Sequence, residues 1–193
     1  LKEQGKLEHA RNAYEKALSI KPDMAGAYNN IANILDEQGK LEEAVETYKK
    51  AISIDPDYAE AYSNMGNTLR EQGKLEEAIG AYKKALSIKP DMPGAYNNMG
   101  VTFRKLKKLE LAIEAFDKVN SQQATAQALE CLYELENYIE FNKRLSLVAN
   151  ADTGNIRVAA ISSFAAQQLG QEDIYPFCKN PLNMVSISNI KNY

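Results

Sequence analysis

The sequence predicts an all-α fold in which pairs of helices repeat along the chain and stack into a solenoid. The first observation is a period of 34 residues in the positions of proline and glycine. These positions are Pro22, Pro56 and Pro90, and Gly5, Gly39 and Gly73. The second is that residues 25–58 and 59–92 are identical at 22 of 34 aligned positions. A unit this short cannot bury a core alone, so neighbouring units must share one.

Each unit is predicted to contain two helices joined by a tight turn. In the unit 25–58, apolar residues recur at the spacing of one helix face, first over 28–35 and again over 41–52. Gly39 lies between the two helices, where a helix end favours left-handed backbone. Pro56 ends the second helix because proline cannot continue it.

The same positions carry a family resemblance. In the unit 59–92 they are Tyr62, Met65, Gly66, Leu69, Ala78, Tyr82, Ala85 and Pro90. This pattern, recurring at fixed spacing over residues 1–123, resembles that of tetratricopeptide repeat (TPR) proteins. The resemblance implies a right-handed superhelix whose first helices line a concave groove that binds extended peptides.

The predicted organisation follows the repeat. We expect a partial repeat at 1–24 and full repeats at 25–58, 59–92 and 93–126, then a divergent helix pair at 127–150, a capping helix at 151–170 and an irregular tail at 171–193. Gly5 is predicted to be a turn, so that the chain opens within a repeat. Either the chain is a piece of a longer array or another molecule covers that end, and we favour the first.

The ends of the last segments are predicted from local signals. Asp152 or Thr153 is a candidate N-cap for the capping helix, and Gly170 is its stop. Alternation at Val185, Ile187 and Ile190 is more typical of a strand than of a helix. The tail is similar to the junction before a 2-oxoglutarate/iron(II) oxygenase domain in some bacterial TPR proteins.

Composition excludes several kinds of partner. The net charge is −3 and the sequence pI is near 5.4, which argues against nucleic acid. No apolar run approaches the roughly 20 residues that span a bilayer, so no membrane partner is expected. Cys131 and Cys178 belong to no ligand-spaced cluster, which argues against a disulfide framework and against zinc. A reducing cytoplasm is the expected location, and no cofactor is expected.

No catalytic residue or metal ligand set is predicted. An iron(II) oxygenase needs two histidines and a carboxylate, and the chain has one histidine, His9. Neither cysteine has a histidine predicted nearby as a base, and no glycine-rich phosphate loop is present. The paired carboxylates Glu42–Glu43 and Glu76–Glu77 are explained by the helix dipole. We therefore predict that the chain is not an enzyme.

Asparagines on the predicted first helices are the candidate binding groups. Asn64 and Asn67 fall on the side of their helix away from Tyr62, Met65 and Leu69, and each costs about 0.6 kcal/mol of helix propensity relative to alanine. Equivalent asparagines recur in the neighbouring units, so stacking should align them in rows. A primary amide can donate to a peptide C=O and accept from a peptide N–H. The alternative is passive polar surface, shared by recently duplicated units.

The rows resemble the asparagine ladder of O-linked N-acetylglucosamine transferases, where such residues hold the polypeptide substrate. Arg70 and Arg104 border the expected groove and are candidates to bind an acidic side chain. The predicted peptide-binding residues are Asn29, Asn30, Asn33, Asn64, Asn67, Asn97, Asn98, Arg70 and Arg104.

Three functions remain open from sequence. The first is a non-catalytic module that binds an extended protein or peptide segment. The second is the recognition arm of a larger modifying enzyme, an oxygenase or a glycosyltransferase, whose catalytic domain lies outside these residues. The third is a scaffold that forms homo-oligomers through the incomplete N-terminal repeat.

Overall fold

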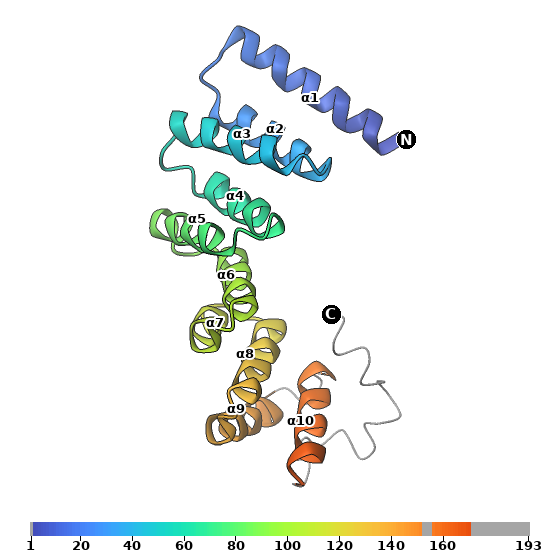
Figure 1. Ribbon diagram of the computed structural model, residues 1–193, viewed down its shortest axis with the longest axis vertical. Helices are drawn as coiled ribbons and strands as arrows, with labels where there is room; N and C mark the ends of the chain where they lie inside the picture. The colour runs from blue at the N-terminus through green and yellow to red at the C-terminus, as the bar shows by residue number, and fades with distance from the viewer. Residues whose placement is uncertain (1, 152–155, 171–193) are drawn as a thin grey trace. The chain divides into compact units, whose positions relative to one another are not determined.

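The computed structural model describes residues 2–151 and 156–170, which form ten helices and no strand (Figure 1). The helices are α1 (Lys2–Ile20), α2 (Ala25–Glu37), α3 (Leu41–Ile54), α4 (Ala59–Glu71), α5 (Leu75–Ile88), α6 (Pro93–Lys105), α7 (Leu109–Phe116), α8 (Gln122–Glu134), α9 (Tyr138–Ala151) and α10 (Ile156–Leu169). This confirms the predicted all-α helical-hairpin solenoid.

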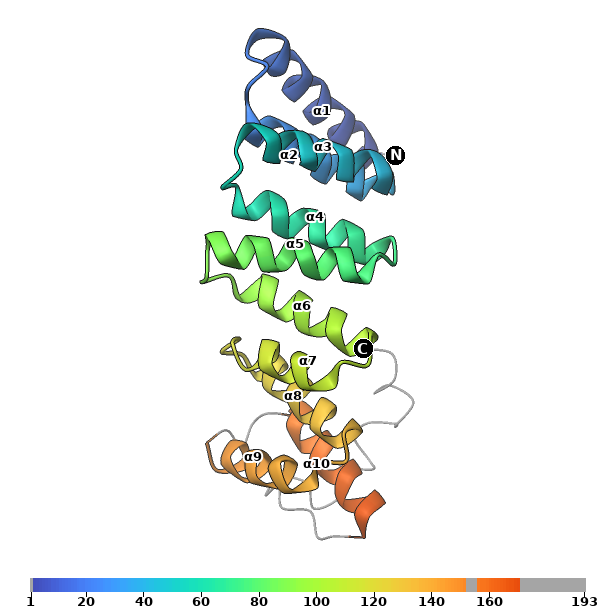
Figure 2. The same ribbon diagram turned by 60° about the vertical axis from the view of Figure 1, so that its left-hand side comes forward.

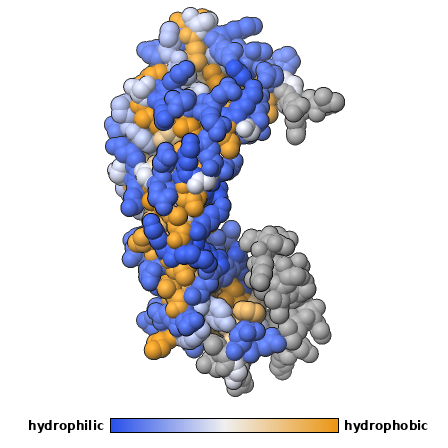
Figure 3. All heavy atoms as spheres, in the orientation of Figure 1, coloured by the Kyte–Doolittle hydropathy of each residue, from blue (hydrophilic) through white to orange (hydrophobic). Residues whose placement is uncertain are grey.

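The chain divides into two units, Leu1–Thr102 and Phe103–Tyr193. In the first unit, α2 pairs with α3 and α4 with α5 (Figure 2). The helix α3 also contacts α4, the first helix of the next pair, and α1 contacts α2. On the face shown in Figure 3, hydrophilic residues cover most of this unit, and apolar residues appear between them in smaller areas.

The turns inside the hairpins share one geometry. A residue with positive φ follows each first helix, and the next N–H donates back to the carbonyl five residues earlier. Gly39 and Gly73 have φ of 73° and 77°, as the sequence predicts. The corresponding bonds are Lys40 N–H to Leu35 O and Lys74 N–H to Leu69 O, both 2.9 Å. Later turns place Lys107 and Glu136 in the same left-handed region, with φ of 59° and 57°.

The core of the first unit is built from small residues beneath aromatic rings. The rings of Tyr48 and Tyr82 are buried, at 1% and 0% exposed. Neighbouring helices complete each hairpin's core. Around Tyr48, for example, Tyr14 and Leu18 of α1 and Met65 of α4 pack against the α2–α3 hairpin. Each hairpin therefore depends on its neighbours for burial.

The prediction of a turn at Gly5 is wrong. The helix α1 runs without interruption from Lys2 to Ile20 and includes Gly5. A separate helical turn before Gly5 would be unfavourable to nucleate by itself. Continuing the helix through Gly5 instead satisfies the local backbone groups.

The predicted repeat boundary after residue 126 falls inside α8. The helix α7 has 8 residues where α3 and α5 have 14. The left-handed residues therefore lie at 39, 73, 107 and 136, so the last interval is five residues shorter than the others. The fourth helix pair is α8 with α9 and starts at Gln122, where Ser121 Oγ accepts from Ala124 N–H as the N-cap.

The last helix, α10, packs against both α8 and α9. The ring of Tyr133 makes edge-to-face contacts with Phe141 of α9 and Phe164 of α10, with centroid separations of 5.9 and 5.8 Å. Gly170 has a φ of 63° at the end of α10, which agrees with its predicted role as a stop. The predicted N-caps Asp152 and Thr153 and the predicted strand and tail at 171–193 lie outside the described residues.

Candidate functional site

Five asparagines from the first helices of successive hairpins form two neighbouring hydrogen-bonded groups, which we call together the asparagine cluster. Its members are Asn29 and Asn33 of α2, Asn64 and Asn67 of α4, and Asn98 of α6. Asn64 Nδ2 donates to Asn29 Oδ1 and Asn33 Oδ1, at 3.3 and 3.2 Å. Asn98 Nδ2 donates to Asn67 Oδ1 at 2.8 Å. The amides therefore link neighbouring repeats, and these bonds offset the helix-propensity cost noted from the sequence.

Two buried tyrosines hold the cluster from the second helices. Tyr48 donates its hydroxyl hydrogen to Asn33 Oδ1 at 2.6 Å, and Tyr82 does the same to Asn67 Oδ1 at 2.8 Å. Burial raises the pKa of both phenols, so both stay protonated donors at neutral pH. Each of the two amide oxygens thus accepts two hydrogen bonds, which orients the amide with its oxygen inward.

The inward bonds leave an alternating set of groups facing out. Within the described residues, no partner is found for the Nδ2 donors of Asn33 and Asn67, nor for the Oδ1 acceptors of Asn64 and Asn98. None of these four groups is enclosed. Along the order of the repeats they read donor, acceptor, donor, acceptor. An extended polypeptide has complementary C=O and N–H groups along its backbone.

The remaining predicted asparagines lie beside the cluster. Asn30 and Asn97 are half-buried, and their side chains make no hydrogen bond within residues 2–151 and 156–170. Asn29 is 5% exposed, so it supports Asn64 rather than presenting its own amide to solvent. The structure therefore brings most of the predicted row together, but through mutual hydrogen bonds that the sequence analysis did not foresee.

In the three hairpins from α2 to α7, the hydrogen-bonded asparagine and tyrosine are either both present or both replaced by apolar residues. Asn33 with Tyr48 and Asn67 with Tyr82 are hydrogen-bonded pairs, whereas the equivalent positions of the next repeat are Val101 and Phe116. Both polar groups are lost in that repeat. A buried hydroxyl without an acceptor is costly, which explains why the two changes accompany each other.

This pairing predicts a double-mutant cycle in the Asn67–Tyr82 pair. Tyr82→Phe is expected to cost about 1 kcal/mol of unfolding free energy, and Asn67→Val about 2 kcal/mol because it strands a buried hydroxyl. The double variant should cost less than the sum by about 1 kcal/mol. Urea denaturation followed by circular dichroism measures all three. Additive costs would show that the hydroxyl and the amide do not interact.

Arg70 lies at the edge of the cluster without a carboxylate partner. Burial raises the pKa of Tyr82, and the nearby Arg70 guanidinium opposes this shift. The Nε of Arg70 is enclosed by protein and has no hydrogen-bond acceptor. Among the residues that the structure describes, Arg70 forms no ion pair.

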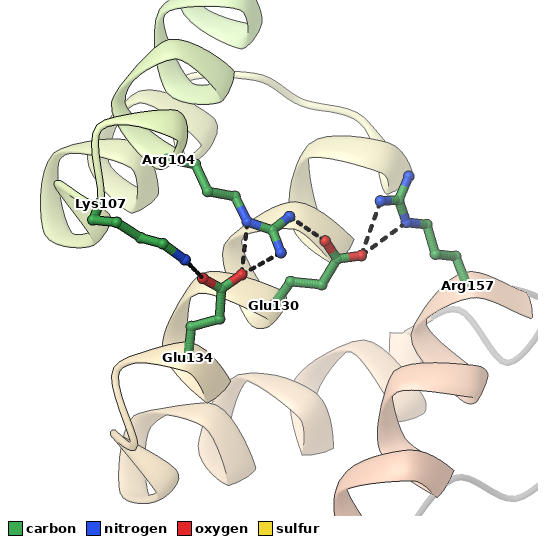
Figure 4. A network of polar contacts seen from close by, with 5 residues as sticks. All are labelled: Arg104, Lys107, Glu130, Glu134 and Arg157. Atoms are coloured by element: carbon green, nitrogen blue, oxygen red, sulfur yellow. Dashed lines mark hydrogen bonds and ion pairs between the residues drawn. The ribbon is translucent and has the colours of Figure 1, made fainter. Parts of the chain in front are cut away.

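Arg104, which was predicted to bind an acidic ligand, is occupied within the second unit. Its guanidinium forms ion pairs with Glu130 and Glu134 of α8 (Figure 4). Lys107 Nζ lies 3.3 Å from Glu134, and Arg157 of α10 lies 2.9 Å from Glu130. We call these five residues the ion-pair network. Burial lowers the pKa of Arg104, but its hydrogen bonds to Glu134 and Glu130 outweigh this and raise it overall. The network joins the start of the unit to α8 and α10, so Arg104 has a structural role.

The sequence analysis missed Gln127. Aligning the left-handed residues, rather than counting 34, places Gln127 at the position of Asn64 and Asn98. Its side chain is buried at 9% exposed, and its Oε1 has no hydrogen-bond partner. Glu130 likewise occupies the position of Asn33 and Asn67. A shorter interval between turn residues is the signal that would have revealed both.

The described residues contain no cluster that could hold a metal through three or more His, Cys, Asp or Glu side chains. Cys131 is buried, and this burial raises the pKa of its thiol to about 12. At neutral pH it is a protonated core residue rather than a nucleophile. No helix within the described ranges combines the length and the apolar character needed to cross a lipid bilayer.

Family models match the chain over its repeats. A TPR repeat model matches residues 1–37, 32–69 and 66–107, and a tetratricopeptide repeat model matches 93–125. The chain belongs to the tetratricopeptide repeat family. TPR proteins typically act as protein–protein interaction modules. The family matches therefore agree with the hairpins found in the structure.

Solved structures show the same TPR fold. PilF of Pseudomonas aeruginosa is 26% identical, with a TM-score of 0.69 over 87% of this chain and 79% of that one. YrrB, a TPR protein with an unusual peptide-binding site, is 24% identical, with a TM-score of 0.69 over 83% of this chain and 86% of that one. MamA is 20% identical, with a TM-score of 0.67 over 86% and 88%. A search of curated protein sequences gave no match.

Proposed function

We propose that this TPR chain binds an extended polypeptide along the asparagine cluster and has no catalytic role of its own. The observation that carries the proposal is the alternation of outward groups. Asn33 and Asn67 offer N–H donors, and Asn64 and Asn98 offer C=O acceptors. These alternating donors and acceptors can hydrogen-bond to the backbone C=O and N–H groups of a ligand and do not require particular side chains.

The internal hydrogen bonds support this proposal because they orient the amides before a ligand arrives. Asn33 Oδ1 is held by Tyr48 and Asn64, so its Nδ2 cannot turn inward without breaking two bonds. A group that is already oriented loses less conformational entropy on binding. The cluster therefore combines two roles, since it joins the repeats and also presents the groups that are left over.

The test replaces one outward donor and keeps the inward bonds. Asn33→Asp retains an oxygen for Tyr48 and Asn64 but replaces the outward Nδ2 by a second acceptor. The ligands are peptides selected from a phage-displayed library of random 12-mers on the immobilised chain, then synthesised with a fluorescent label. Anisotropy titration should show about tenfold weaker binding to the variant, because a donor is lost and two acceptors face each other.

The matched control is Asn12→Asp, the same chemical change at an exposed position of α1. It should leave peptide affinity unchanged, and thermal denaturation should show that both variants are folded. Failure to enrich any peptide contradicts the proposal. Equal affinity of the wild type and Asn33→Asp for every selected peptide contradicts it as well.

A further inference from the structure

One position of the first helices changes its charge from repeat to repeat. It is occupied by Asp36 in α2, Arg70 in α4 and Arg104 in α6. Asp36 accepts a hydrogen bond from Thr68 Oγ1 at 2.6 Å. Arg104 is bound by two glutamates of α8. Within the described residues, Arg70 is the one of these three equivalent side chains that forms no hydrogen bond or ion pair with a side chain of the next first helix.

The sequence explains why Arg70 lacks carboxylates. Glu130 and Glu134, the partners of Arg104, occupy positions whose equivalents one repeat earlier are Val101 and Lys105. A valine has no acceptor, and a lysine repels a guanidinium. The repeat that follows Arg70 therefore carries no carboxylate where the repeat that follows Arg104 carries two.

The surroundings of Arg70 leave its charge incompletely solvated. The side chain is half-buried, and Nε is enclosed without an acceptor, while neither Nη group is enclosed. A guanidinium recognises a carboxylate through two parallel N–H bonds, a geometry that a single water does not reproduce. A carboxylate from a ligand could therefore reach the two Nη groups, which are not enclosed.

Arg70 is also placed at the site of the proposed function. Its guanidinium is close enough to Tyr82 to counter the effect of burial on that phenol, and Tyr82 donates to Asn67 of the asparagine cluster. A ligand backbone that meets the outward Nδ2 of Asn67 would thus pass near Arg70. An acidic side chain of that ligand is the group that matches an unpaired half-buried cation.

We infer that the polypeptide bound by the asparagine cluster carries an aspartate or glutamate whose carboxylate pairs with Arg70. This inference rests on the proposed function and names the ligand class, an acidic extended segment. The amides bind the backbone, and Arg70 selects one side chain. Specificity in this arrangement comes from a first-helix position at which the repeats differ in the sign of their charge.

The experiment repeats the random 12-mer selection on the full chain and on two variants, Arg70→Gln and Arg70→Glu. Wild type should enrich peptides that share one Asp or Glu, and changing that residue to Asn or Gln in a synthetic peptide should weaken binding about tenfold. Arg70→Gln should bind both forms of the peptide equally. Arg70→Glu should instead enrich Lys or Arg at the same position, which a purely structural arginine would not cause.

Lys84→Gln is the matched control, because Lys84 is an exposed cation of α5 in the same unit. It should retain the acidic preference. Two results would overturn the role of Arg70: the selected peptides share no acidic residue, or changing the acid to an amide weakens binding to Arg70→Gln as much as to the wild type. If binding of these peptides still depended on Asn33, the proposed function would remain in place. Enrichment of no peptide at all would overturn both.

Discussion

Gly66→Leu is expected to destabilise the first unit by about 3 kcal/mol, the upper part of the range for overpacked cores. Gly66 lies on α4 beneath the fully buried ring of Tyr82. A Cβ placed on Gly66 would come within 2.7 Å of a ring carbon, closer than such atoms approach. A leucine adds three further carbons in the same place, so α4 and α5 must separate or the ring must leave its site.

Alanine at the same position is a weaker test, because the preceding repeat has Ala32 there and buries it completely. That repeat shows that the hairpin can adjust to one methyl group. The side chain of leucine is too large for the hairpin to accommodate by the same adjustment. Thermal and urea denaturation followed by circular dichroism measure the loss, and an unchanged midpoint would show that small size at residue 66 does not set the spacing of α4 and α5.

Gly80 provides the control for the glycine itself. It is an exposed helical residue of α5, and an added Cβ would meet nothing within 4 Å. Gly80→Ala should therefore stabilise the chain by up to about 1 kcal/mol through helix propensity. Opposite signs for Gly66→Leu and Gly80→Ala would separate the packing effect from the backbone effect.

Glu130→Gln is expected to lower the unfolding free energy of the second unit by about 2 kcal/mol. Its carboxylate is 14% exposed and lies between the guanidinium groups of Arg104 and Arg157. Removing one partner of a largely buried pair leaves uncompensated charge, which costs more than the pair contributes when intact. Here two arginines lose a partner at once, although Arg104 keeps Glu134.

The measurement is urea denaturation at low and high salt. Because the side chain of Glu130 is only 14% exposed, most of the loss should persist in 1 M salt. Glu46→Gln is the control, since Glu46 forms an exposed ion pair with Lys49 on α3 and should show no measurable effect. A loss for Glu130→Gln that vanishes in salt would show that the network is a surface feature.

Much of the fold was predictable because its signals are local. The left-handed turns at Gly39 and Gly73 and the stop at Gly170 follow from residues within a few positions of each other. The turn at Gly5 was wrongly predicted because glycine adopts helical as well as left-handed backbone, and α1 continues through it. The predicted boundary after residue 126 falls inside α8 because a constant period of 34 does not account for the short helix α7.

The candidate site was predictable in its membership but not in its bonding. Helical periodicity identified Asn64 and Asn67 as a polar side of α4, and the repeat identified their counterparts. Neither signal showed that Asn64 donates hydrogen bonds to asparagines of α2, or that the Tyr82 hydroxyl donates to Asn67. The ion pair of Arg104 with Glu130 was not predicted, because counting 34 residues per repeat does not align Glu130 with the first-helix positions Asn33 and Asn67. The last interval between turn residues is five residues shorter.

The sequence by itself determined that this protein is a stack of helical hairpins, because helix periodicity and turn residues act over short stretches of chain. Only the tertiary structure decided which polar groups of the described residues form hydrogen bonds or ion pairs within the protein and which do not. That outcome depends on side chains about 30 residues apart meeting across a helix interface. The contrast between a paired Arg104 and an unpaired Arg70 arises in this way, from equivalent residues with different neighbours.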